Sequence, residues 1–209
     1  MRIICKEESY GLCVKGKDSQ ENLKNYGSYI ASLLTRLDYG AIGNVIKCFL
    51  EARKRNATIF FAGNGGSAAT ASHFSQDLGG VGRKIGVKCF RTISLTDSTP
   101  FMTALGNDYG YDKIFTYQLR NLFQKGDIFV AISASGNSPN IVEAVKWAKR
   151  SGGIVIGFIG FDGGKLLKLC HHAVHVPTDK NEYGPVEDIH IILNHMITSS
   201  IMHSNYFTK

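Results

Sequence analysis

The sequence predicts an α/β protein in which a five-stranded parallel sheet forms the middle layer of a three-layer sandwich. Two observations carry this prediction. Short, nearly continuous runs of Val, Ile and Phe recur along the chain and end in turn residues, and segments with the apolar period of a helix separate them. Strands of a parallel sheet have this uninterrupted apolar character because helices cover both faces of the sheet.

The expected elements follow one another in a regular order. Residues 18–55 are expected to form a helical hairpin, because apolar residues recur at helical spacing through both of its halves. The expected strands are 57–63, 90–97, 127–135, 154–160 and 172–177, and later helices are expected over 115–123, 141–148 and 186–202. Residues 1–17 have little pattern, so we expect an N-terminal extension of unknown role before a single domain over 18–209.

Composition excludes several classes of protein. With 209 residues, 44% of them hydrophobic and 20% charged, the chain resembles a soluble globular protein, and it has no apolar run long enough to span a membrane. Five widely spaced cysteines without a C-x-x-C pair are typical of reduced thiols in a cytoplasmic protein. The net charge of +7 comes from scattered Lys and Arg, which argues against a nucleic-acid partner and suits anionic metabolites.

Three of the expected strand ends are rich in glycine and serine: 63–67 (GNGGS), 133–138 (SASGNS) and 160–165 (GFDGGK). Ligands of parallel sheets bind beyond the carboxyl ends of the strands. Glycine exposes backbone N–H groups, serine adds a hydroxyl donor, and a following helix N-terminus attracts anions. The composition therefore predicts a phosphate site, although the same residues also serve as plain turns and helix caps.

The first of these loops also fits the dinucleotide pattern G-x-G-x-x-A through Gly63, Gly65 and Ala68. A single match is weak support, and Asp97, the acidic residue that ends the next strand, comes later than the pattern requires. No Gly-Lys-Ser/Thr follows the glycines, which excludes a P-loop. A dinucleotide-dependent oxidoreductase thus stays open as an alternative, but we expect no nucleotide cofactor.

Two expected helices carry candidate acid–base or metal-binding residues. His73 and Asp77, four residues apart, share one helix face, so both can reach one substrate or one metal ion. His195 lies on the last helix, where geometry alone allows either Glu187 or Asp188 as its partner. Pairs of this kind also occur as ordinary surface hydrogen bonds.

Several other polar residues are expected to be structural. His171, His172 and His175 enter or lie on a strand, and His190 faces away from His195, which favours packing or an interface. Tyr109 and Tyr111 are expected in a turn or in the core.

The chain resembles the sugar isomerase (SIS) domain family in four motifs, GNGGSAATASHF, TDSTPFMTALGNDYGYDKIF, AISASGNSPNIVEAVKWAK and VEDIHIILNH. They occur in the order and spacing of the family between about residue 20 and residue 200. The resemblance implies a flavodoxin-like sheet and an isomerase of a phosphorylated sugar, here sedoheptulose 7-phosphate converted through an enediol into a precursor of surface-polysaccharide heptose. It also implies a cytoplasmic homotetramer with active sites at subunit junctions.

The resemblance further implies roles for particular residues. The phosphate would be held by the first two glycine- and serine-rich loops, through Gly65, Gly66, Ser67, Ser133, Ser135 and Ser138. Asn64, Asp97 and Glu187 would lie near the sugar, Asp77 would be the carbon-acid base, and His195 would be the second acid–base group. A zinc ion, when present, would be bound by His73, Asp77, Glu187 and His195.

The sequence departs from the family pattern at two of these positions. Asp77 stands where the family has Glu, and Glu187 stands where it has Gln. Some relatives with this fold are non-catalytic adaptors, including ones that bind a replication initiator, or sugar-phosphate-sensing regulators. Such a role remains the alternative to catalysis at this point, and retention of both carboxylates and both histidines favours the enzyme.

Overall fold

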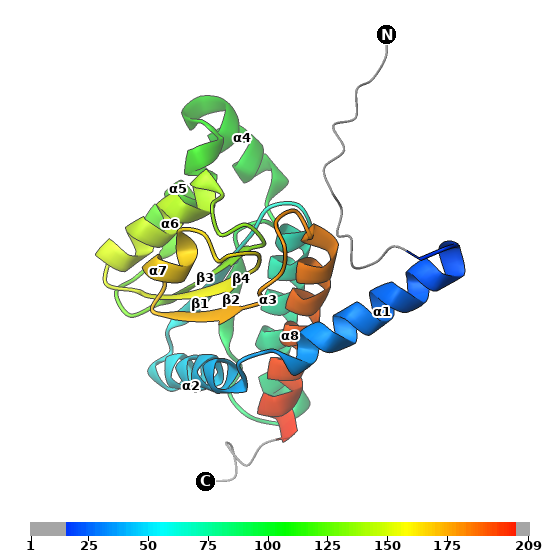
Figure 1. The fold of residues 1–209 in the computed structure, drawn as a ribbon. Coiled ribbons are helices and arrows are strands. Elements are labelled where there is room, and N and C mark those ends of the chain that lie inside the picture. The colour runs from blue at the N-terminus through cyan, green and yellow to red at the C-terminus, as the bar shows by residue number, and fades with distance from the viewer. Residues whose placement is uncertain (1–15, 204–209) are drawn as a thin grey trace.

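The computed structural model describes residues 16–203. The extension expected over residues 1–17 therefore lies outside the described residues, except for its last two positions. One all-parallel sheet runs in the order β2-β1-β3-β4-β5, built from β1 (Thr58–Ala62), β2 (Arg91–Ser94), β3 (Ile128–Ser133), β4 (Ile154–Ile159) and β5 (His172–His175). Helices lie on both faces of this sheet (Figure 1), which confirms the predicted three-layer sandwich and its five strands.

The strands direct alternate side chains to opposite faces of the sheet. In β1, Ile59 and Phe61 enter the core on one face, and Phe60 and Ala62 enter the core on the other. The first core is closed by α2 (Tyr39–Arg55), α3 (Gly66–Lys84) and α8 (Tyr183–His203), and the second by α5 (Ile114–Leu122), α6 (Pro139–Arg150) and α7 (Leu166–Leu169). Burial on both faces explains why the three central strands, β1, β3 and β4, are almost entirely apolar, whereas the edge strands β2 and β5 are partly exposed and carry polar residues.

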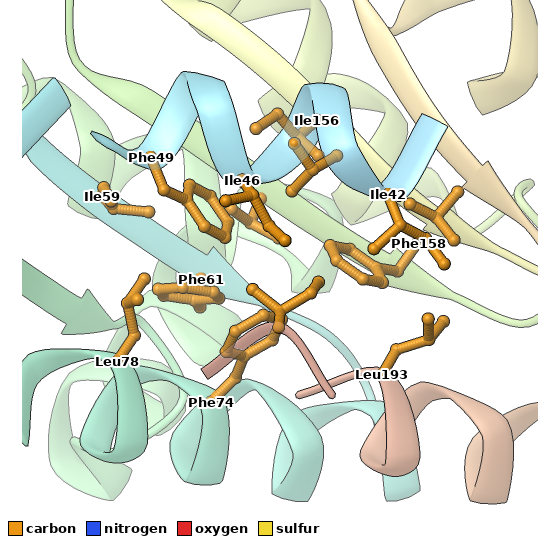
Figure 2. Close-up of a cluster of buried hydrophobic side chains, with 14 of the residues drawn as sticks. Ile42, Ile46, Phe49, Ile59, Phe61, Phe74, Leu78, Ile156, Phe158 and Leu193 are labelled. Carbon is orange, nitrogen blue, oxygen red and sulfur yellow. The ribbon is translucent and has the colours of Figure 1, made fainter. Parts of the chain in front are cut away.

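Phe74 of α3 lies at the centre of the first core (Figure 2). Its ring contacts Phe61 and Phe158 of the sheet at centroid distances of 5.0 and 5.5 Å, and Phe49 of α2 at 6.0 Å. Truncating such a side chain to alanine typically costs about 3–5 kcal/mol. This packing fixes the rotation of α3 about its axis, and therefore the direction in which its neighbour His73 points.

The two helices predicted over 18–55 are present, but they diverge instead of packing side by side as a hairpin. α1 (Ser19–Thr35) packs against α8 and extends away from the sheet, whereas α2 lies flat beneath it (Figure 1). α1 buries fully only Leu33, and its tyrosines are held by polar contacts: Tyr26 Oη donates to Asp188 and Tyr29 Oη donates to Glu182. Burial, the bond to Asp188 and the charges of Asp188 and Glu187 raise the pKa of Tyr26.

A second projecting segment consists of α4 (Thr99–Tyr109) and the short 3₁₀ turn η2 (Tyr111–Lys113). α4 buries only Leu105 fully and stands out from the body of the molecule (Figure 1). In the described part of the chain, no helix has both the length and the apolarity that crossing a membrane requires.

Candidate active site

The strand order places a topological switch point between β1 and β3. From β1 the chain continues to β2 on one side, and β3 then lies on the other side of β1. A pocket of about 110 Å³ opens there, at the carboxyl ends of these strands. It is lined by Asn64, Ser67, Ile132, Ser133, Ala134, Ser135, Ser138, Tyr183 and Glu187. The first two serine-bearing loops therefore meet in one pocket, which we call the phosphate pocket.

Three helix N-termini face this pocket. α3 begins at Gly66 and α6 at Pro139, directly after the two loops, and α8 begins at Tyr183, which lines the pocket itself. Each N-terminus contributes free N–H groups and about half a positive charge. Serine hydroxyl groups lie close together beside these helix ends. Ser133 Oγ lies 3.4 Å from Ser138 Oγ and 3.2 Å from the backbone N of Gly136. This arrangement suits a phosphoryl group.

The third glycine-rich strand end, residues 160–165, does not line the phosphate pocket. It supports the second loop from behind, because Leu166 N–H donates to Gly136 O and Lys165 N–H donates to Asn137 Oδ1, each at 3.1 Å. Its similarity in composition to the other two ends therefore reflects tight loop packing and not a third set of ligand contacts.

Two glycines of the first loop are required by geometry. Gly65 has φ +56°, a conformation that side chains with a Cβ disfavour. A Cβ on Gly66 would lie 2.2 Å from Glu187 Oε2, so the glycine allows the Glu187 carboxylate to lie over the start of α3. Burial, reinforced by the charge of Asp188, raises the pKa of Glu187. In its neutral form a carboxyl group can donate a hydrogen bond, which a carboxylate cannot.

The structure separates Asn64 from Asp97, two of the three residues expected near the sugar. Asn64 lines the phosphate pocket, and its amide is held by Asn140, which the sequence did not single out, and by Tyr111, which was expected to be structural. Asp97 follows β2, is exposed, and accepts a hydrogen bond from Ser72 of α3 without lining the pocket. Nothing in the local pattern of residues 111 and 140 indicates these contacts, because they join segments that are distant in the sequence.

The candidate acid–base residues form a second cluster, on the touching faces of α3 and α8. His73 Nε2 lies 3.2 Å from Asp77 Oδ2, His195 Nε2 lies 3.7 Å from the same oxygen, and the two Nε2 atoms are 3.5 Å apart. These three residues line a groove of about 280 Å³ together with Val81, Lys84, Thr198, Ser199 and Met202. The predicted pairing of His73, Asp77 and His195 is thus present; we call it the His/Asp cluster.

Core packing on both helices aims this cluster outwards. On α8, Leu193 and Ile197 enter the core, which leaves His195 between them with 58% of its side chain exposed. Asp77 is more enclosed, with 17% of its side chain exposed, and buried Asn194 donates a hydrogen bond of 2.8 Å to its Oδ2. Asn194 is another residue that sequence reasoning missed, since its role depends on how α8 packs on α3.

The His/Asp cluster has the donor set and spacing of a zinc site. Two imidazoles and one carboxylate are common ligands of catalytic zinc, and tetrahedral bonds of about 2.0–2.1 Å place ligand atoms about 3.4 Å apart. All three donor atoms lie within 4.8 Å of one another, and their separations bracket the tetrahedral value. Among the described residues, Glu187 is not part of this cluster and lines the phosphate pocket instead.

The phosphate pocket and the His/Asp cluster share no lining residue within one chain. α3 and α8 lie side by side and run in the same direction, because Glu187 lies beside Gly66 and His195 lies beside His73. At 1.5 Å per residue, the cluster is displaced from the pocket by about 12 Å along α8 (Glu187 to His195). Along α3, Ser67 of the pocket is about 9 Å from His73 and about 15 Å from Asp77.

Three of the histidines expected to be structural have structural contacts. His171 Nδ1 accepts the Val155 N–H, His175 contacts the Phe161 carbonyl, and buried His190 meets the edge of the Phe158 ring. Placing Tyr109 and Tyr111 in the core was wrong: they are 56% and 59% exposed, because α4 and η2 project from the body. Asp188, the alternative partner of His195, binds Tyr26 instead.

A SIS domain model matches residues 25–160 of the chain, about two thirds of its length. The chain belongs to the SIS domain family. Within that family its sequence is similar to phosphoheptose isomerases. It is 42% identical to the phosphoheptose isomerase of Aliarcobacter butzleri over 156 residues, which cover 74% of this chain and 80% of that protein.

Solved structures agree with this placement. The structure of phosphoheptose isomerase GmhA from Neisseria gonorrhoeae matches 87% of this chain and 97% of its own, with a TM-score of 0.79 and 31% identity. A phosphoheptose isomerase structure from Francisella tularensis matches 90% of this chain and 100% of its own, with a TM-score of 0.81 and 26% identity. These comparisons agree with the fold and the family expected from the sequence motifs.

Proposed function

We propose that this protein is a phosphosugar isomerase that converts sedoheptulose 7-phosphate into D-glycero-D-manno-heptose 7-phosphate. The observation that carries the proposal is the coexistence of a serine-lined pocket at three helix N-termini with a separate His/Asp cluster. The pocket suits a phosphoryl group, and the cluster supplies the acid–base groups that an isomerisation needs. The names of the relatives support the seven-carbon substrate.

The chemistry requires a base that moves a proton between neighbouring carbons and a second group that moves the hydroxyl proton. Asp77 is the proposed carbon-acid base, and Asn194 orients it by donating to Oδ2. His195 is the proposed second group, since its Nε2 lies close enough to Asp77 for both to touch adjacent atoms of one substrate. Asp77 takes the proton from one carbon and returns it to the next, while His195 relays the proton between the two oxygens. Positioned groups of this kind each contribute about 10²–10⁴-fold.

The same cluster is the proposed zinc site. His73, Asp77 and His195 would hold the ion, which when bound polarises a carbonyl oxygen as a Lewis acid. Glu187, the fourth ligand expected from the resemblance, is displaced by about 12 Å along α8 from His195. Glu187 of the same chain is therefore too distant to join the set, and we propose that a second copy of the chain supplies it.

The separation of the two regions also supports active sites at subunit junctions. A seven-carbon sugar built from bonds of about 1.5 Å spans at most about 10 Å from phosphorus to C1. This length is shorter than the offset of about 12–15 Å along the helices between the pocket and the two proposed acid–base residues, His195 and Asp77. We therefore propose that the phosphate pocket of one chain works with the His/Asp cluster of another, in a homotetramer.

The proposed setting is the cytoplasm, where the product would feed the heptose precursors of a surface polysaccharide. Cys48, Cys89 and Cys170 are free thiols in the structure, which suits a reducing compartment. Burial raises the pKa of the Cys170 thiol to about 12, so this cysteine is unreactive.

Isomerisation in deuterated water tests the proposed activity. The purified protein, incubated with sedoheptulose 7-phosphate, should form the aldose and carry solvent deuterium at C2, because the proton returned by Asp77 exchanges with solvent. The matched control is the Asp77→Asn variant, which keeps the shape of the side chain and lacks the base. Absence of product and of label with seven-, six- and five-carbon ketose phosphates would refute the proposal and favour a non-catalytic adaptor or sensor.

A further inference from the structure

Asn64, which lines the phosphate pocket, exchanges two hydrogen bonds with buried Asn140. Asn64 Nδ2 donates to Asn140 Oδ1, and Asn140 Nδ2 donates to Asn64 Oδ1, each at 2.9 Å. Asn64 belongs to the loop after β1, which carries Ser67, and Asn140 lies in the first turn of α6, directly after the loop of Ser133 and Ser138. The pair therefore joins the two loops that supply the serines of the pocket.

The orientation of both amides is determined by a backbone group. The Ile141 N–H donates to Asn140 Oδ1 at 2.9 Å, and a backbone N–H can only donate. This contact identifies the oxygen of Asn140, so its NH₂ group must face Asn64 Oδ1. Asn140 is 2% exposed, which leaves its side chain little freedom to rotate.

Tyr111 fills the second acceptor position of the Asn64 side-chain oxygen. Its Oη donates to Asn64 Oδ1 at 3.0 Å from the projecting segment of α4 and η2. An amide oxygen accepts two hydrogen bonds and an amide nitrogen donates two. Among the described residues, Asn64 Oδ1 thus has both of its acceptor positions filled, and Asn64 Nδ2 has one hydrogen left.

We propose that Asn140 and Tyr111 are positioning residues of the phosphate pocket, which fix Asn64 as a hydrogen-bond donor with no acceptor to offer. Asn64 then binds a ligand oxygen that carries no hydrogen, such as a phosphate oxygen, and rejects a hydroxyl group that must donate. The same contacts hold the loops of β1 and β3 at the separation that one phosphoryl group needs. The inference rests on the assignment of this pocket to phosphate.

A double-mutant cycle on inorganic phosphate binding tests this inference. The variants are Asn64→Ala, Asn140→Leu, which has a similar size and no hydrogen bonds, and the double variant. Isothermal titration calorimetry should show that each single variant weakens phosphate binding by about 3–10-fold, as expected for one hydrogen bond. In the Asn64→Ala background, Asn140→Leu should add less than about twofold, because it acts through Asn64.

Equal effects of Asn140→Leu in both backgrounds, or no effect in the wild-type background, would overturn the inference. If Asn140→Leu does not fold, the same cycle is run with Tyr111→Phe, which removes only an exposed hydroxyl group; a loss of about twofold that disappears in the Asn64→Ala background supports the inference, and no loss overturns it. Tyr109→Phe is the matched control, since Tyr109 packs on Tyr117 nearby and should leave binding unchanged.

The readout needs no turnover, so it separates this inference from the proposed isomerase activity. A wild-type protein that binds phosphate and shows the predicted coupling supports the positioning role even if sedoheptulose 7-phosphate is not its substrate. A wild-type protein that binds no phosphate at millimolar concentration overturns both the pocket assignment and the inference that rests on it.

Discussion

The phosphate pocket and the His/Asp cluster are built in opposite ways. The pocket gathers short loops from the ends of adjacent strands, and the sheet register sets their spacing. The cluster takes side chains from the faces of two long helices, and core residues behind them, such as Phe74 and Leu193, set their direction. One region depends on backbone placement and the other on helix rotation.

This difference has a functional meaning. The pocket supplies serines, free N–H groups and Asn64 from a single chain, so it can hold a phosphoryl group without help. The cluster is exposed along a groove that shares no lining residue with the pocket of its own chain, and we have proposed that the pocket of another chain delivers the substrate to it. Binding and chemistry are therefore expected to respond to mutation separately, which the following predictions exploit.

Asp77→Asn should have the largest effect. It removes the base while keeping the hydrogen-bonded shape, so kcat should fall by about 10³-fold. The dissociation constant for inorganic phosphate should stay within twofold of wild type, because the pocket lies elsewhere. Steady-state kinetics and calorimetry measure the two quantities, and a loss of phosphate binding together with kcat would mean that the two regions are not separate.

The second largest effect is expected for His73→Ala, which should weaken zinc binding. Removing one of three ligands from the His/Asp cluster should lower zinc affinity by about 100-fold or more, since even supporting residues around a metal ligand change affinity by about 10–100-fold. Competition with a chromophoric chelator measures this change. His172→Ala, a histidine on β5 away from the cluster, is the control and should bind zinc as wild type does.

Ser133→Ala should act on binding more than on chemistry. The proposed role of the Ser133 hydroxyl is to donate to a charged phosphate. A hydrogen bond of this kind is worth about 1.5–3 kcal/mol, so KM should rise about 10–100-fold. The expected change in kcat is much smaller. Ser151→Ala, at the far end of α6, is the matched control; an equal fall in kcat for Ser133→Ala would place that serine in the chemical step.

The smallest predicted effect is on the pH dependence of the free energy of unfolding. It concerns His190, which lies on α8 between the two regions. Burial lowers its pKa to about 4, an effect that the nearby Ile159 backbone opposes only in part. Because the folded protein binds this proton less readily than the unfolded chain, the contribution to stability is complete above the unfolded pKa of about 6.5 and is lost as pH falls towards 4.

Between pH 7 and pH 5 the protonation of His190 should lower the free energy of unfolding by about 2 kcal/mol. The His190→Gln variant cannot take up the proton, so its free energy of unfolding should fall less over the same range. Urea unfolding of both proteins at the two pH values measures the difference. Identical acid losses in the two proteins would show that His190 is not the titrating group.

The sequence predicts the sheet well because the position of each strand is encoded in its own short apolar segment. Strands buried on both faces must be apolar throughout, and 57–63, 127–135 and 154–160 have that pattern, so their positions follow without any tertiary knowledge. The serine-rich ends follow in the same way, since the carboxyl ends of neighbouring parallel strands meet at one edge. The third glycine-rich end has a similar composition, but only packing shows that it supports a loop.

The parts that could not be predicted depend on contacts between distant segments. Tyr111 and Asn140 reach Asn64 from 47 and 76 residues away, and Asn194 reaches Asp77 from 117 residues away. The same limit explains the divergence of α1 from α2, because the helical period shows which face is apolar but not which surface covers it. Glu187 was expected to bind the same zinc ion as His195, but the two residues lie about 12 Å apart along α8.

The central claim is that the phosphate pocket and the His/Asp cluster of different chains form one active site. Mixing two inactive variants tests it most directly: Ser133→Asp, which blocks phosphate binding, and Asp77→Asn, which lacks the base. After subunit exchange, verified by native mass spectrometry, the equal mixture should recover about one quarter of wild-type activity, because some junctions combine two intact halves. A verified mixture that stays as inactive as its two parents would contradict the claim.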